Sequence, residues 1–267
     1  MLNLTLLRQD TRRSWRILFL FTVLMIACEV ILLSFYDPVQ GLKDTAWLDA
    51  MPARLVEALG IDLADGSLTG YISSYLFGFC YLLLPLIFTV VLGNVLVTYP
   101  TQNGMMAYDL SLPEPRGTVI FGKIYLILME LFGMFLISGA AGMVFCALVY
   151  PGKLEIPQYI LLWLGAYVLH LCLGGIAFLA ACICNELKTS LMIGAGLAVL
   201  FLVAHMLGRM GGSLEFLCHV TPFALFCPGE LLDGSWTLYW KLPAAVFIGI
   251  LCFFVGGKVF EKKDLPL

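Results

Sequence analysis

Six long runs of apolar residues, separated by shorter polar segments, dominate the chain. Each run is long enough for a helix to cross the hydrocarbon core of a bilayer, which takes roughly 20 residues. The expected spans are 17–36, 75–97, 119–149, 158–184, 190–207 and 239–260. The third is longer than a bilayer requires, so we expect it to be tilted or to begin outside the membrane. This pattern predicts an all-α membrane protein with six transmembrane helices in one domain, residues 1–267.

Three of the polar segments carry patterns of their own. Residues 1–14 combine leucines with arginines, which is typical of an amphipathic helix that lies along a membrane surface. In the loop 36–70, apolar residues recur at helical spacing from Trp47 to Leu59, so we expect a small amphipathic helix there. The segment 208–238 is too broken by glycine and proline to span a membrane.

The segment from Asn103 to Lys123 is the polar interruption between the second and third spans. Gly104 ends the preceding helix, and an apolar-polar run then continues for about two helical turns. Pro113 and Pro115 end that run, because proline lacks an N–H and restricts the residue before it. We therefore expect a short helix that stands off the membrane; the alternative is an ordinary loop with a helical turn.

Composition and charge agree with a membrane protein and orient it. The chain is 61% hydrophobic and 12% charged, against roughly 45–50% and about 25% in soluble domains, and its mean hydropathy is +0.97. A net charge of −3 gives no indication of nucleic-acid binding. Placing the N-terminus in the cytoplasm puts ten of the fifteen lysines and arginines inside, so we expect both termini there. The ten are Arg8, Arg12, Arg13, Arg16, Arg116, Lys123, Lys188, Lys258, Lys262 and Lys263.

Four polar residues inside the spans are candidates for a substrate path. Glu29 and Glu130 are the acids that lie deep in apolar sequence, where a charge is costly. Asn94 and His205 lie in the second and fifth spans. For each, the alternative is a structural group that is neutral or hydrogen-bonded to a neighbouring helix.

Motifs for metal or nucleotide chemistry are weak or missing from the sequence. Cys218, His219 and Cys227 lie between the fifth and sixth spans and could form a disulfide or a metal site. Their spacing fits no standard zinc pattern, so we favour free thiols and no metal. The phosphate-binding loop GxxxxGK[ST] does not occur, and neither does HExxH. We therefore expect no enzymatic activity, no catalytic residues and no cofactor on this chain.

Two groups of residues, together with the six spans, resemble a known family. Residues 103–108 read NGMMAY and residues 111–116 read SLPEPR, with Lys123 following; TPF at 221–223 precedes the last span, and KKDL at 262–265 follows it. This pattern resembles the membrane subunits of bacterial ABC exporters of the type-2 permease superfamily. The chain departs from it at two positions, where family members often carry an acid or arginine in place of Asn103 and a serine in place of Met105.

The resemblance implies a coupling helix at 102–112 that fits a cleft on a separate ATPase. Its residues and flank are Gly104, Met105, Met106, Ala107, Tyr108, Ser111, Leu112, Pro113 and Arg116. We expect Met105, Met106 and Tyr108 to be buried against the ATPase, while Arg116 and Lys123 hold the turn near the lipid headgroups.

The resemblance also implies how the whole chain is arranged in its assembly. Residues 1–14 would be an interfacial helix, and residues 212–232 would form re-entrant helices on the outer side, between spans five and six. Two permease chains, identical or related, would work with two ATPase subunits that carry ATP and Mg²⁺, in the lipid of a bacterial plasma membrane. The substrate path would lie between the permeases, along spans one, two and five.

Two functions compete on this basis. One is the permease subunit of an ATP-driven ABC exporter. The other is a non-transporting membrane scaffold or sensor of a peptide or antibiotic stress system. An ATPase gene beside this one would favour the first, and a kinase gene alone would favour the second.

Overall fold

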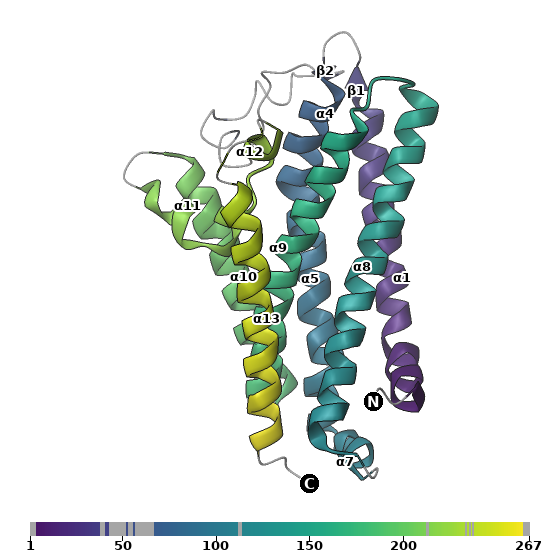
Figure 1. The fold of residues 1–267 in the computed structure, drawn as a ribbon, viewed down its shortest axis with the longest axis vertical. Helices are drawn as coiled ribbons and strands as arrows, with labels where there is room; N and C mark the ends of the chain where they lie inside the picture. The colour runs from purple at the N-terminus through teal and green to yellow at the C-terminus, as the bar shows by residue number, and fades with distance from the viewer. Residues whose placement is uncertain are drawn as a thin grey trace.

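The protein is a bundle of helices long and apolar enough to cross a membrane (Figure 1). The structure is a computed structural model that describes residues 4–37, 41–42, 52, 56, 67–111, 114–211, 214–232, 234, 236 and 238–263. Six helical stretches in these residues meet the length and hydropathy of a membrane span. The chain is therefore a helical, multi-pass membrane protein, as its hydrophobic pattern predicts.

The six spans follow the predicted order and extend beyond several predicted ends. They are α1 (Leu4–Ser34), the stretch Leu68–Gln102, α8 (Arg116–Val149), α9 (Ile156–Ile183), α10 (Leu187–Arg209) and α13 (Leu238–Lys262). The largest difference lies at the N-terminus, where most of the segment expected at 1–14 belongs to α1. No glycine or proline interrupts residues 4–34, and Asp10 and Ser14 are buried, so the helix continues without a break.

Two π-helical stretches interrupt the α-helix of the second span. It consists of α4 (Leu68–Tyr71), η1 (Ile72–Cys80), α5 (Tyr81–Gly93), η2 (Asn94–Thr98) and α6 (Tyr99–Gln102), and η1 and η2 are π-helical. Pro85 lies inside α5 and has no N–H to donate to the carbonyl of Tyr81, the residue that directly follows η1. The wider turns therefore end where the proline already prevents a regular α-helical hydrogen bond.

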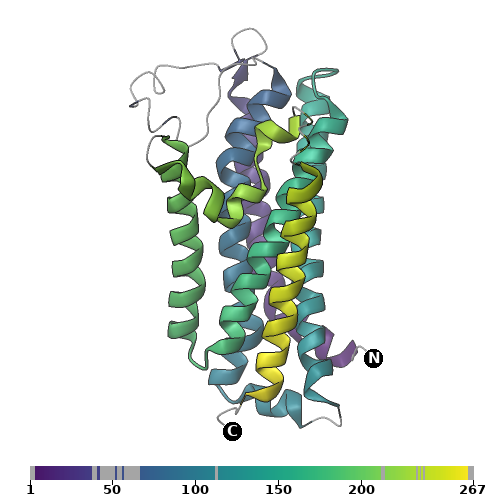
Figure 2. The ribbon, with the colours of Figure 1, turned by 60° about the vertical axis from the view of Figure 1, so that its left-hand side comes forward.

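Short elements connect the spans at both ends of the bundle. Helix α7 (Met105–Leu110) lies between α6 and α8. The strands β1 (Tyr36–Asp37) and β2 (Gly41–Leu42) pair antiparallel after α1. Helices α11 (Phe216–Val220), η4 (Pro222–Leu225) and α12 (Pro228–Leu232) run across the bundle between α10 and α13 (Figure 2). None of these three is long enough to span a membrane.

The centre of the bundle is formed by α9 and the second span. In an 18-residue apolar stretch of α9, 72% of the residues are buried, and the share is 67% in the second span. In α1 and α10 the corresponding share is 22%. Glycines allow α13 to approach α9 closely, because a Cβ at Gly175 would lie 2.7 Å from the carbonyl oxygen of Gly249. Close backbone contact of this kind stabilises helix pairs in lipid, which offers little hydrophobic driving force.

The two ends of the bundle differ in what they carry. The start of α1, helix α7 and the end of α13 lie together at one end, called the α7 end below (Figure 1). The strands, α12 and the turn between α8 and α9 lie at the opposite end. The amphipathic helix expected between Trp47 and Leu59 lies outside the described residues, as do Leu112, Pro113 and residues 264–265.

Candidate functional site

Helix α7 starts and stops where the sequence provides unusual backbone conformations. Gly104 has φ +70°, a left-handed conformation that glycine adopts without the clash of a Cβ, and this turns the chain from α6 into α7. Pro115, with φ −65° and ψ 145°, precedes the first residue of α8. The predicted short helix between the second and third spans is therefore present, and it is six residues long.

The two faces of α7 have different surroundings. Met106 and Asp109, three residues apart on one helical face, are 1% and 3% exposed. Tyr108 points away from the bundle and is 80% exposed, and Ser111 is also exposed. Met105 and Ala107 are half-buried. Met106 packs in the hydrophobic core of its own chain, so in this conformation Tyr108, rather than Met106, offers surface to a partner.

Buried charges fix the inner face of α7 to two spans. Lys123 of α8 is 1% exposed, and its Nζ lies 3.0 Å from Asp10 Oδ2 of α1 and 3.3 Å from Asp109 Oδ2 of α7. Arg13 Nη1 lies 3.6 Å from Asp10 Oδ1, which balances two carboxylates with two cations. We call these four residues the Lys123 cluster. A buried charge is tolerated when it is paired in this way.

This cluster corrects the expectation for Lys123 and leaves Arg116 at the surface. Lys123 contacts two carboxylates inside the protein and is not exposed to lipid headgroups. Arg116 is exposed, and its Nη1 donates to the backbone oxygen of Lys263 at 3.2 Å, so it ties the start of α8 to the end of α13. Asp10 and Asp109 were missed because acids in short amphipathic segments look like solvated residues in a sequence.

Glu130 adds a second polar contact between α1 and α8. The hydroxyl of Ser14 donates to its Oε1. Its Oε2 has no hydrogen-bond partner among the described residues, although the side chain is 5% exposed. Ser14 and Glu130 thus connect α1 and α8, two of the three helices that carry the Lys123 cluster.

Glu29 is the centre of a separate hydrogen-bonded group in the interior of the bundle. Its side chain is 0% exposed and accepts from the hydroxyl of Tyr159 at 2.9 Å and from that of Tyr81 at 3.4 Å. Tyr81 also lies 3.2 Å from Ser138 Oγ, so the group joins α1, α5, α8 and α9. A Cβ added at Gly142 would overlap the Glu29 carboxylate. The structure therefore fits the hydrogen-bonded alternative for Glu29.

The remaining two candidates also have partners of their own. The side-chain amide of Asn94 donates to the carbonyl of Val90 at 2.8 Å, and its oxygen has no partner within the described ranges. His205 is 6% exposed, with its Nδ1 3.4 Å from Thr221 Oγ1 and its ring against Phe223. Glu29, Asn94, Glu130 and His205 thus do not gather into one site.

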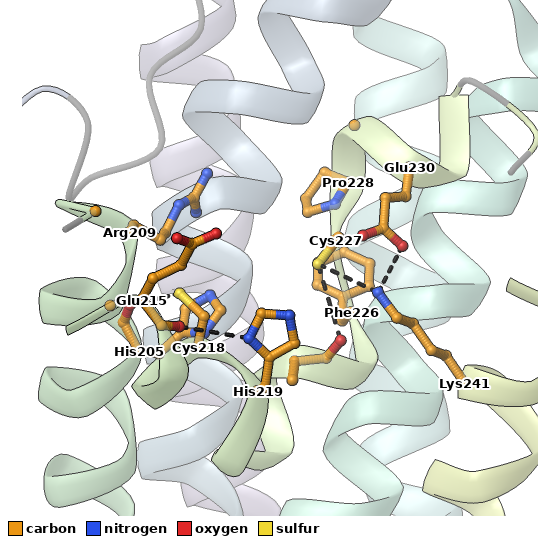
Figure 3. Close-up of a pocket in the computed structure, with 14 residues that line it drawn as sticks. His205, Arg209, Glu215, Cys218, His219, Phe226, Cys227, Pro228, Glu230 and Lys241 are labelled. Carbon is orange, nitrogen blue, oxygen red and sulfur yellow. Dashed lines mark hydrogen bonds and ion pairs between the residues drawn. The ribbon is translucent and has the colours of Figure 1, made fainter. Parts of the chain in front are cut away.

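A pocket of about 440 Å³ opens beside the C-terminal end of α10 (Figure 3). Its polar lining comes from α10, the segment that folds back through α11 and α12, and α13. The charged members are Arg209, Glu215, Glu230 and Lys241. Lys241 Nζ lies 2.5 Å from Glu230 Oε2, and the pair closes one side of the pocket. The sequence singled out this segment for its cysteines and missed the charges, which only the folded chain brings together.

The two cysteines of this pocket are not joined in a disulfide. Cys218 and Cys227 are free thiols, and burial raises the pKa of both above the usual range. Among the described residues, no group of three or more histidine, cysteine, aspartate or glutamate side chains has an arrangement that could hold a metal ion.

Comparison with known proteins leaves the chain without an assigned family. No family model matches it, and no curated protein matches it either. Its function must therefore be argued from its own residues.

Proposed function

We propose that the chain is the transmembrane permease subunit of an ATP-driven exporter, and that α7 receives force from a separate ATPase. The observation that carries this proposal is the attachment of α7. Its buried face is held to α1 and α8 by the Lys123 cluster, while its outward face exposes Tyr108 at the end of the bundle. ATP and Mg²⁺ would bind to the ATPase.

The Lys123 cluster can transmit a displacement of α7 to the spans α1 and α8. Lys123 contacts a carboxylate on α1 and another on α7 from its own place on α8. Moving α7 alone would separate buried opposite charges, which is costly in a medium of low dielectric constant. A partner that displaces α7 would therefore move the adjoining parts of α1 and α8 with it.

The proposed orientation places the α7 end and both termini in the cytoplasm of a bacterial cell. The lysine and arginine bias supports this side. Helix α1 has 31 residues and is about 46 Å long, so its first turns extend beyond a hydrocarbon core of roughly 30 Å, where an interfacial segment would lie. The segment from α11 to α12 would then be the re-entrant part on the outer side.

Cysteine labelling tests this orientation. We expect a cysteine at Ser111, in a background without other cysteines, to react with an impermeant reagent only after the cells are opened. Ser111 is exposed at the end of α7, so access from its own side is not blocked by the chain. Labelling from outside intact cells would reverse the topology and remove the coupling role.

A second permease chain would complete the substrate path. In the apolar stretches of α1 and α10, 22% of the residues are buried, so the outward faces of these helices are available to a second chain and to lipid. Because the chain lacks a phosphate-binding loop, we assign the ATPase to two further subunits.

The decisive test is the change Tyr108→Asp, with Tyr239→Asp as the matched control. Tyr108 and Tyr239 are 80% and 72% exposed, so neither change should unfold the bundle. Aromatic anchors at interfaces commonly contribute about 2 kcal/mol or more, so we expect the Tyr108 variant to bind its ATPase about thirtyfold more weakly. The measurements are copurification with the ATPase and substrate-stimulated hydrolysis.

Met106 is unsuitable for this test, because Met106→Asp would place a charge in the hydrophobic core of the chain. If the Tyr108 variant kept both copurification and stimulated hydrolysis, α7 would not be the coupling element. The non-transporting membrane scaffold or sensor would then be the better account.

A further inference from the structure

The pocket at the end of α10 holds two charged side chains that have no partner among the residues the structure describes. Arg209 and Glu215 both line it, and neither side chain makes a hydrogen bond or an ion pair with any residue that the structure describes. The other two charged members, Lys241 and Glu230, pair with each other. Within the described part of the chain, Arg209 and Glu215 thus leave a cation and an anion available on the same side of the pocket (Figure 3).

The depth of the pocket matches the boundary between hydrocarbon and water. Arg209 is the last residue of α10, whose 23 residues give a length of about 35 Å, close to the thickness of the hydrocarbon core. At the start of α13, Tyr239 and Trp240 are 72% and 57% exposed beside Lys241. Exposed tyrosine and tryptophan are typical of the headgroup level of a membrane. Phosphate groups of lipids lie at this level.

Exposed apolar side chains also lie on two of the helices that carry the pocket. Phe216 and Val220, four residues apart on α11, are 60% and 70% exposed. Leu207 and Val203 are exposed on α10. A molecule with its polar end in the pocket can therefore lay hydrocarbon chains along these two helices.

We propose that this pocket binds a zwitterionic phosphoethanolamine group, with its phosphate at Arg209 and its ammonium at Glu215. A guanidinium forms charge-assisted, often bidentate, hydrogen bonds with phosphate, and a carboxylate accepts from an ammonium. The pocket volume lies within the roughly 300–1,000 Å³ of ordinary ligand sites. The group is supplied either by a bilayer lipid or by a soluble headgroup molecule. This inference does not depend on the exporter proposal.

Arginine at the end of a membrane helix has a simpler role, which is to extend its charge toward the water. That role predicts no preference among headgroups and no dependence on Glu215. A selective site predicts both. The experiment therefore measures selectivity as well as affinity.

The experiment is native mass spectrometry of the full chain with phosphatidylethanolamine and, separately, with phosphatidylglycerol. We expect the unaltered protein to prefer phosphatidylethanolamine. Arg209→Gln should weaken binding of both lipids about tenfold, which is the usual worth of a hydrogen bond to a charged group. Glu215→Gln should remove the preference and leave binding of phosphatidylglycerol intact. Lys153→Gln, an exposed cation in the turn between α8 and α9, is the matched control and should change nothing.

Soluble glycerophosphoethanolamine separates the two sources. If it displaces the lipid at comparable concentration, the headgroup alone is sufficient and a soluble ligand is the source; if it does not, the acyl chains contribute and the bilayer is the source. Equal effects of Arg209→Gln and Lys153→Gln, or unchanged selectivity in Glu215→Gln, would overturn the proposal. If Arg209→Gln unfolds, Arg209→Lys replaces it: this variant keeps the charge but loses the bidentate contact with phosphate, so binding of both lipids should still weaken.

Discussion

The two ends of the bundle treat charged side chains in opposite ways. At the α7 end, Lys123 is buried and has a carboxylate partner on each of two other helices. At the opposite end, Arg209 and Glu215 line an open pocket and have no partner among the described residues. Buried, paired charges fix helices relative to one another, and accessible, unpaired charges are available to a ligand. The same residue types thus support connection at one end and recognition at the other.

The largest expected effect comes from removing the cation of the Lys123 cluster. Lys123→Met leaves the Asp10 and Asp109 carboxylates buried without their shared partner. Breaking a buried ion pair in this way costs about 3–5 kcal/mol, so we expect the free energy of unfolding to fall by that amount. Thermal unfolding in lipid nanodiscs measures it.

A combined variant controls for the loss of the lysine itself. Changing Asp109 to asparagine together with Lys123→Met removes one positive and one negative charge and leaves Asp10 paired with Arg13. Most of the lost stability should return, because no buried charge is left unpaired. If Lys123→Met alone unfolded like the unaltered protein, the cluster would not hold α7 to the bundle.

A smaller loss of stability is expected in the interior of the bundle, where Glu29 contributes hydrogen bonds but no ion pair. Glu29→Ala removes the acceptor of the Tyr159 and Tyr81 hydroxyls, although Tyr81 keeps Ser138 and Tyr159 keeps the Gly139 carbonyl. Buried polar groups that lose a partner cost about 1–3 kcal/mol, which is the expected loss. Glu29→Gln should recover part of it, since an amide can bond to both hydroxyls. Equal loss in both variants would contradict this account.

The smallest effect should come from the ion pair at the pocket. Lys241 and Glu230 side chains are 15% and 41% exposed, so water screens their attraction. We expect Lys241→Met to change the free energy of unfolding by about 0–1 kcal/mol, in contrast to the same substitution at Lys123. A loss as large as that of Lys123→Met, measured in the same nanodiscs, would remove the distinction between the two ends.

The sequence is sufficient to predict the six spans and the short helix α7, because both depend on local patterns. Runs of apolar residues define a span by length alone, and Gly104 and the following prolines limit a helix wherever they occur. The partners of Lys123 could not be predicted in this way. Asp10 lies 113 residues from it in the sequence, and only the packing of α1 against α8 brings the two together.

The candidate site shows the same division between local and long-range information. Glu29 stands out in the sequence as an acid in an apolar run, yet only the fold shows that Tyr159, 130 residues away, donates a hydrogen bond to it. Tyr108 and Met106 look alike as apolar members of a short loop. Their different exposure depends on which side of α7 faces the core, and the structure supplies that side.

The π-helical turns of η1 have a consequence for insertions and deletions in the second span. Each residue of an α-helix turns the chain by about 100°, so one residue added or removed rotates everything that follows by that angle. Tyr81 is the first residue after η1, and its hydroxyl faces Glu29 only in the present rotation. The wider turns accommodate more residues per turn than an α-helix does. Deleting one residue from η1 would therefore leave a continuous, hydrogen-bonded helix. The Tyr81 hydroxyl, however, would no longer face Glu29.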